Sequence, residues 1–199
     1  LPHMWDPTIH RPGTGPRPHD FAWVGTAFES RIRFFEQCDF DGLDVLFGGN
    51  WEQLADGHPL ERYLIDDRAA CRFNAETADL YRQAKTSANW YRKETSENGT
   101  ADGWAIGPRE VELAATETFF LREARGEGDD LFPTLPTFSE AAEFSDKLRW
   151  WLSHDNARDA AIAAARTAVA DRSNVDVMAG FCRLVDGVGK VFHPTITAA

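Results

Sequence analysis

Short apolar runs alternate with amphipathic stretches along most of the chain, which is the pattern of an α/β protein. The apolar runs fit strands buried on both faces, and they predict strands at residues 21–24, 43–47, 86–91 and 118–121. Apolar positions at helical spacing predict helices at residues 28–37, 75–84, from 108 onward, 139–152, about 156–171 and 174–188. Because strands joined by helices run parallel, the pattern predicts a Rossmann-like, doubly wound parallel sheet.

Polar residues and prolines mark where these elements begin and end. Asn74 and Ser139 are predicted helix caps, and Pro108 suits a first helical position, where no N–H is needed. Residues 94–102 are expected to form a polar loop. Residues 126–136, which contain two prolines, are expected to be irregular.

Proline content also separates the start of the chain from the rest. Five of the ten prolines lie within residues 1–19, so this segment is predicted to be an extended arm or interdomain linker. Residues 20–172 carry the alternating pattern and form the predicted domain. Residues 173–199 are predicted to be a C-terminal helix and a tail.

Composition narrows the function. With 43% hydrophobic residues the chain can bury a sizeable core, and its net charge of −11 argues against general nucleic-acid binding. No apolar run is long enough to span a membrane. Three cysteines without disulfide or metal spacing fit reduced thiols, so we expect a cytoplasmic protein.

The helix that begins at Pro108 carries the most informative residues. A helix N-terminus can hold a phosphate through its free N–H groups and its dipole, and Arg109 adds a full positive charge there. Glu112 lies one turn along on the same face and can accept hydrogen bonds from two hydroxyl groups. This combination suits the diphosphate and ribose of a nucleotide; the alternative is an ordinary surface pair.

Two further candidates follow predicted strands, where ligands of parallel sheets bind. Gly25, Thr26 and Arg31 follow the first strand and can offer N–H groups and charge to an anion, or form an ordinary turn. Asn89 ends the strand that leads toward the Pro108 helix. No metal-ligand spacing and no GxGxxG, Walker or GxSxG motif occurs, so no metal site is expected.

In their order, these segments resemble the donor domain of group 1, GT-B glycosyltransferases related to the spore-maturation protein CgeB. Residues 21–26 with Arg31 are similar to its first strand and loop, and residues 107–121 to its R-x-x-E-x-x-A helix and the strand after it. Residues 138–155 with Arg158 resemble its closing helices and their L-x-H-D-x-x-R link.

The resemblance implies the C-terminal, nucleotide-sugar-binding half of a GT-B enzyme, with a UDP- or GDP-sugar as substrate and no cofactor. It implies that Glu112 binds the ribose hydroxyls and that Arg109 and Arg31 lie near the diphosphate. The Gly25–Thr26 backbone would line the cleft. It also implies metal-independent chemistry, because the helix dipole and basic side chains stabilise the departing diphosphate.

The sequence departs from that family pattern in three ways. Trp104 stands where many relatives have a second acidic residue, and Glu117 stands where relatives usually have glycine. The third departure is a missing acceptor half. Residues 1–18 resemble the linker between the two GT-B domains, so the acceptor half is expected to be absent from this chain, and the donor half is expected to be inactive without it.

The leading hypothesis is therefore a glycosyltransferase donor domain that needs an acceptor domain or partner chain. The alternative is a non-catalytic module, either for nucleotide binding or for protein interaction. A dinucleotide-dependent oxidoreductase is disfavoured because Gly25 lacks the partner glycines. The sugar, the acceptor and the stereochemistry of transfer are not encoded in any recognisable motif.

Overall fold

The structure, a computed structural model, describes residues 1–94 and 103–192, with side chains described up to residue 186. Within this part, a parallel sheet has the order β2-β1-β3-β4. The strands are β1 (His19–Val24), β2 (Val45–Gly48), β3 (Ala84–Asn89) and β4 (Phe119–Arg122). The predicted fold class is confirmed.

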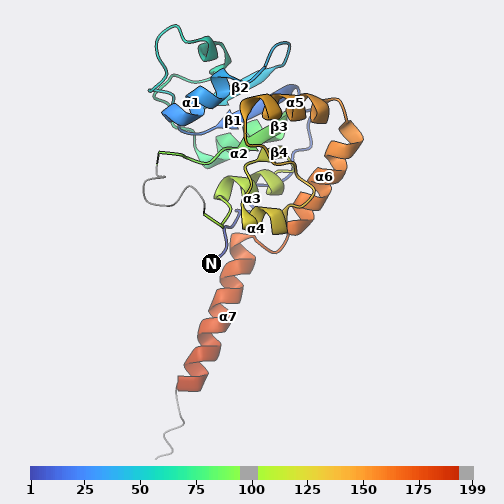
Figure 1. The fold of residues 1–199 in the computed structure, drawn as a ribbon. Helices are drawn as coiled ribbons and strands as arrows, with labels where there is room; N and C mark the ends of the chain where they lie inside the picture. The colour runs from blue at the N-terminus through green and yellow to red at the C-terminus, as the bar shows by residue number, and fades with distance from the viewer. Residues whose placement is uncertain (95–102, 193–199) are drawn as a thin grey trace, which may run out of the picture.

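Helices connect and cover these strands (Figure 1). They are α1 (Glu29–Glu36), α2 (Asn74–Gln83), α3 (Pro108–Ala115), α4 (Gly126–Leu131), α5 (Ala141–Leu152), α6 (Asp155–Ala168), α7 (Asn174–Phe192) and the 3-10 turn η1 (Pro59–Tyr63).

Isolated parallel bridges extend the sheet at both edges. Leu64 pairs beside Phe47 of β2, and Thr137 pairs beside Arg122 of β4. With these two positions the strand order becomes that of a doubly wound α/β fold, in which the direction of winding reverses beside the first strand. This reversal lies between β1 and β3.

Aromatic side chains fill the layer between the sheet and helices α1 and α5. The ring centre of Phe21 in β1 lies 6.4 Å from the ring centre of Phe35 in α1 and 5.7 Å from that of Phe144 in α5. Helices α2, α3 and α6 pack on one another and on the sheet, with Tyr81, Val111 and other apolar side chains fully buried. Both sheet faces are covered, which explains the apolar runs of β1, β2 and β4; β3 is buried as well, although Thr86, Ser87 and Asn89 are polar.

Three sequence predictions about local structure were wrong. Residues 126–131 form α4 rather than an irregular segment. Ser139 precedes the cap of α5, which is Glu140, and its N–H and hydroxyl both donate to the Glu143 carboxylate. Asn74 is the first residue of α2 rather than its cap. The predicted polar loop lies, apart from Glu94, outside the described residues.

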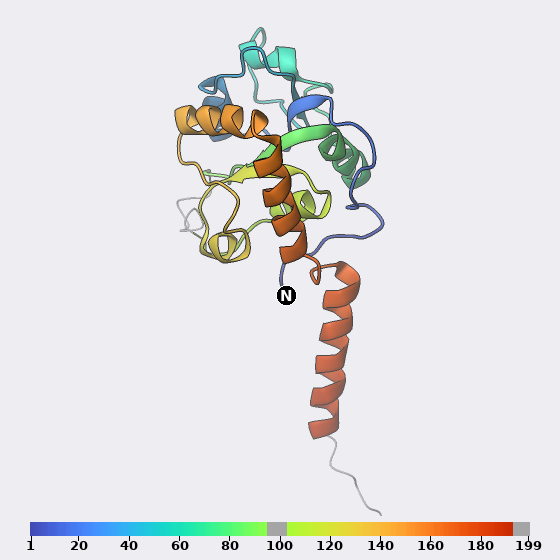
Figure 2. The same cartoon turned by 90° about the vertical axis from the view of Figure 1, so that its right-hand side faces the viewer.

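The N-terminal arm packs on the domain. Trp5 is 7% exposed, and its indole N–H donates to the Val169 carbonyl at 2.8 Å. The Arg17 guanidinium donates to the carbonyls of Ala84 and Glu117 at 2.8 and 2.7 Å. Helix α7 begins beside Trp5 and projects away from the α/β unit (Figures 1 and 2).

Candidate functional site at the carboxyl edge of the sheet

The loops after β1 and β2 lie against each other at the carboxyl edge. The Gly25 N–H donates to the Gly48 carbonyl at 3.1 Å, and the Ala27 N–H to the Asn50 carbonyl at 2.8 Å. Gly49 has a φ of 93°, and a Cβ there would lie 2.6 Å from the Gly25 oxygen, so glycine is required. Trp51 of the second loop is buried and stacks on Phe47.

Arg109 reaches from the first turn of α3 to this edge. Its guanidinium donates to the Val24 carbonyl at 2.7 Å and to Asn89 Oδ1 at 3.2 Å, and its Cζ lies 5.0 Å from the centre of the Trp23 ring. A Cβ at Gly25 would lie 2.7 Å from Arg109 Nη2. The structure therefore brings Gly25, Asn89 and Arg109 together.

Arg31 places a second cation beside the same tryptophan. Its Cζ lies 5.3 Å from the Trp23 ring centre, and its guanidinium donates to the carbonyls of Thr26 and Trp90 at 2.8 and 2.9 Å. Burial, followed by repulsion from Arg109, lowers the pKa of Arg31 to about 10, which leaves it charged at neutral pH. Arg31 thus shapes the Thr26 loop as well as adding charge.

Neither arginine has a carboxylate within 4.0 Å among the described residues. Two neighbouring cations that form no ion pair within the described residues, next to the N-terminus of α3, create a local positive potential that favours an anion, although the charges of Glu94 and Glu123 act on Arg31 from a greater distance.

The first turn of α3 is held by a buried carboxylate. Glu110 is fully buried, and its Oε2 accepts hydrogen bonds from the Gly107 N–H at 2.9 Å and from the Tyr91 hydroxyl. Burial raises the pKa of Glu110, and burial together with the Glu110 charge raises the pKa of Tyr91. This pair fixes the start of α3 to the segment after β3.

Glu112 lies one turn after Arg109 in α3, and 24% of its side chain is exposed. Its nearest basic side chain among the described residues is His10 of the N-terminal arm, with His10 Nε2 3.9 Å from Glu112 Oε1. The Glu112 carboxylate is therefore within reach of a ligand and free to accept hydrogen bonds.

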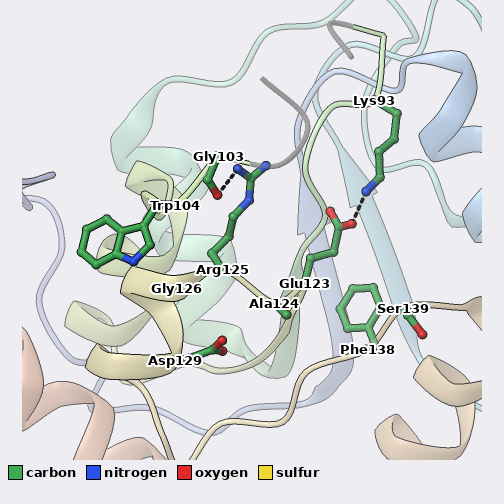
Figure 3. Close-up of a pocket in the computed structure, with 10 residues that line it drawn as sticks. All are labelled: Lys93, Gly103, Trp104, Glu123, Ala124, Arg125, Gly126, Asp129, Phe138 and Ser139. Atoms are coloured by element: carbon green, nitrogen blue, oxygen red, sulfur yellow. Dashed lines mark hydrogen bonds and ion pairs between the residues drawn. The ribbon is translucent and has the colours of Figure 1, made fainter. Parts of the chain in front are cut away.

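A pocket of about 590 Å³ opens beyond the carboxyl ends of β3 and β4 (Figure 3). Arg125 donates to the Gly103 carbonyl and lies 4.1 Å from the Tyr91 ring centre, while Lys93 pairs with Glu123. The pocket is lined by Lys93, Gly103, Trp104, Glu123, Ala124, Arg125, Gly126, Asp129, Phe138 and Ser139.

Most residues of this pocket were not predicted from the sequence. Of the lining residues, Trp104 was named as a departure from a family pattern and Ser139 as a helix cap; Trp104 is 64% exposed. Glu123 and Arg125 come within three residues of the end of β4, so their positions after a parallel strand were the available signal. The pairing of Glu123 with Lys93 carried no such signal, because it joins segments after two different strands.

The parallel sheet order defines an α/β, Rossmann-like architecture, and the fold is that of GT-B glycosyltransferase domains. The sequence model of the glycosyl transferase-like family matches residues 31–180. The chain therefore belongs to this family. No curated protein matches the chain.

Solved structures with the same fold are distant in sequence. The C-terminal domain of a glycosyl transferase group 1 family protein from Francisella tularensis has a TM-score of 0.60 and 12% identity, over 84% of this chain and 97% of that one. Sucrose-phosphate synthase from Thermosynechococcus elongatus has a TM-score of 0.63 and 15% identity, over 94% of this chain and 52% of that one.

A third structure is the DNA-modifying enzyme β-glucosyltransferase, solved with and without its substrate uridine diphosphoglucose. Its TM-score is 0.56 and its identity 16%, over 82% of this chain and 50% of that one. The chain thus spans about half the length of two of these enzymes. At such identities the similarity shows the fold alone.

Within the described residues, no helix is both long and apolar enough to cross a membrane. Among the same residues, no three His, Cys, Asp or Glu side chains are grouped as metal ligands.

Proposed function

We propose that this chain is the donor-binding domain of a glycosyltransferase and that it binds a nucleotide-activated sugar, such as a UDP- or GDP-sugar. The observation that carries the proposal is the pair of cations, Arg31 and Arg109, without a carboxylate partner in the described residues, beside the N-terminus of α3. Such a site suits a diphosphate. The family of the chain supports the same ligand class.

Each part of the donor has a proposed position. The diphosphate lies against the Gly25–Thr26 loop, near Arg109, with Asn89 orienting the guanidinium. The ribose hydroxyls donate to Glu112. The sugar extends toward the pocket that contains Trp104 and Arg125, which opens at the same edge of the sheet.

Transfer breaks the bond between the anomeric carbon and the phosphate oxygen, while an acceptor oxygen forms the new bond. Negative charge develops on the departing nucleoside diphosphate, where Arg109, Arg31 and the α3 dipole stabilise it. We propose that no bound metal is needed for donor binding.

The acceptor half is proposed to be a second domain or a partner chain outside these 199 residues. Two of the enzymes with which the chain shares its fold are about twice as long. Turnover is expected only when this half is supplied. The three cysteines are free, which fits the cytoplasmic location that we propose. Membership of the CgeB-like subgroup stays a prediction.

Calorimetric titration with UDP, GDP, dTDP and their sugar conjugates tests the donor site. Saturable binding of one nucleotide is expected, at least about tenfold weaker in Arg109→Ala and in Glu112→Ala, since each loses a hydrogen bond to a charged group. Arg33→Ala is the matched control, because Arg33 is 64% exposed and pairs only with Glu29 among the described residues. Binding should also survive EDTA.

Two results would contradict the proposal. A folded protein that binds none of these nucleotides would favour a protein-interaction module. Binding that is unchanged in Arg109→Ala would show that the nucleotide occupies another site. Binding without turnover, in the presence of an acceptor half, would favour the non-catalytic nucleotide-binding module.

A further inference from the structure

His10 of the N-terminal arm lies against the carboxylate of Glu112. The side chain of His10 is almost fully buried, at 7% exposed, and its Nε2 is 3.9 Å from Glu112 Oε1. The two residues are far apart in the chain, and only the packing of the arm on α2 and α3 brings them together. A buried imidazole next to a half-buried carboxylate calls for an explanation, because both side chains lose hydration there.

The arm is held on both sides of His10. Arg82 of α2 donates to the Ile9 carbonyl at 2.8 Å and to the Arg11 carbonyl at 3.2 Å. Gly13 passes close to the Arg82 stem, where a Cβ would lie 3.0 Å from Arg82 Cβ. The imidazole therefore has a defined position relative to α3, because the arm on both sides of it is bound to α2.

Hydrogen bonding fixes which ring nitrogen of His10 carries the proton. The Asp6 N–H donates to His10 Nδ1 at 3.1 Å, so a neutral ring must carry its hydrogen on Nε2, the atom that faces Glu112. Burial lowers the pKa of His10; the charges of Glu112 and Asp6 oppose this effect and the charge of Arg82 adds to it. At neutral pH the ring is thus uncharged, and its N–H lies on the nitrogen nearer the Glu112 carboxylate, at 3.9 Å and so beyond hydrogen-bond distance.

We infer that His10 is a positioning residue, which orients the Glu112 carboxylate so that it accepts the hydroxyl hydrogen bonds of a ribose. The inference rests on the proposed function, and it names the ligand class more narrowly as ribonucleoside diphosphates rather than their 2′-deoxy forms. Glu112 alone can rotate about its side-chain torsions. With His10 Nε2 packed 3.9 Å from one oxygen, the carboxylate has less room to rotate, and its other oxygen is left for the diol.

The experiment compares the affinities of UDP and 2′-deoxy-UDP, with GDP and 2′-deoxy-GDP as the second pair. In the wild-type chain the 2′-deoxy ligand of the pair that binds should be about tenfold weaker, because one hydrogen bond to a charged acceptor is lost. The ratio of the two affinities is the readout, since a change in the folded fraction alters both affinities equally.

Two substitutions separate the two nitrogens of His10. The amide of His10→Asn can replace Nδ1 as the acceptor for the Asp6 N–H but does not reach Glu112. The longer His10→Gln can place an N–H near Glu112 in place of Nε2. His10→Asn should lose the preference for the ribonucleotide, and His10→Gln should keep most of it. His154→Gln, at an exposed histidine between α5 and α6, is the matched control.

Each other result has a definite meaning. A wild-type preference that persists in His10→Asn would overturn the role of His10 while leaving the donor site intact. Loss in His10→Gln but not in His10→Asn would show that His10 only anchors the arm. A wild-type chain that binds neither UDP nor GDP would overturn the proposed function, and this inference with it.

Discussion

Gly25 has no side chain at the point where Arg109 crosses the end of β1. A Cβ at this position would lie 2.7 Å from Arg109 Nη2 and 2.9 Å from the Trp23 ring, so Gly25→Ala must displace the guanidinium. We expect nucleotide binding to weaken at least about tenfold and the free energy of unfolding to fall by about 1–3 kcal/mol, as for overpacking. Calorimetry and urea unfolding measure the two effects.

Gly15→Ala is the control for this substitution, because nothing lies within 4 Å of a Cβ at Gly15. It should leave both quantities unchanged. Equal behaviour of the two alanine variants would show that Arg109 does not need its observed position.

Glu110 makes the stability of the domain depend on pH in a direction that can be worked out. Burial raises its folded pKa above the ordinary value of 4.5, so the folded state holds a proton that the unfolded state has released. Stability is therefore fully present below about pH 4.5 and decreases as the pH rises through the folded pKa.

Glu110→Gln removes this titration while keeping an oxygen that can accept from Gly107 and Tyr91. Urea unfolding at about pH 5 and about pH 8 should show a smaller loss of stability over this interval in Glu110→Gln than in the wild type. All other titrating groups are common to both chains. A loss of the same size in both would mean that Glu110 is ionised in the folded protein.

At this scale the sequence predicted which residues meet but not how deeply they are buried. Gly25, Asn89 and Arg109 lie together as expected, since Gly25 and Asn89 stand at the ends of strands and Arg109 stands in the first turn of a helix. The burial of Arg31 depends on Trp90, which is remote in the chain and which no local pattern connects to it. The role of these residues in donor binding stays a prediction.

Among the elements, the turn from α3 to β4 contains a strained residue. Glu117 has a φ of 55°, the left-handed conformation that a glycine adopts without strain, and it stands where relatives of the resembled family usually have glycine. Its carbonyl accepts from Arg17 at 2.7 Å, a bond that any residue can make.

Glu117→Gly should therefore raise the free energy of unfolding by up to about 1 kcal/mol, because relief of the strain exceeds the extra entropy of glycine in the unfolded chain. Urea unfolding measures the change. A clear loss of stability would show that the Glu117 side chain makes a compensating contact, for example with the Arg17 charge.

Element boundaries show where local signals are reliable. The start of α3 was predicted correctly, since Pro108 cannot serve as a hydrogen-bonded donor and fits a first turn. The helix α4 was missed, because Gly126 and Gly128 are poor helix formers. A Cβ at Gly128 would lie 2.8 Å from Arg122 Nη1, so the buried guanidinium occupies the space that a side chain would need. Tertiary packing there overrides helix propensity.

Over the whole molecule, hydrogen bonds join the N-terminal arm to the start of α7 and to the segment just before it. The Asn174 N–H donates to the Trp5 carbonyl at 2.8 Å, and the Trp5 N–H to the Arg172 carbonyl at 3.1 Å. Trp5→Ala should lower the free energy of unfolding by about 3 kcal/mol, as for other large-to-small changes at buried aromatic residues.

Phe181→Ala provides the comparison. Phe181 is 42% exposed on α7, so its loss should change the free energy of unfolding by less than about 0.5 kcal/mol. Urea unfolding followed by tryptophan fluorescence distinguishes the two variants. If Trp5→Ala were as stable as the wild type, the arm would not be part of the folded unit.

The alternation of strands and helices, the parallel sheet, the start of α3 and the meeting of strand-end residues at one edge could all be predicted from the chain's local patterns. These patterns are the hydrophobic period, helix-start chemistry and strand direction, which a few neighbouring residues encode. The packing of the arm, the burial of Glu110 and Arg31, and the approach of His10 to Glu112 became visible in the folded protein alone. Those features depend on burial and contact between residues remote in the chain, which arise only when the whole chain packs.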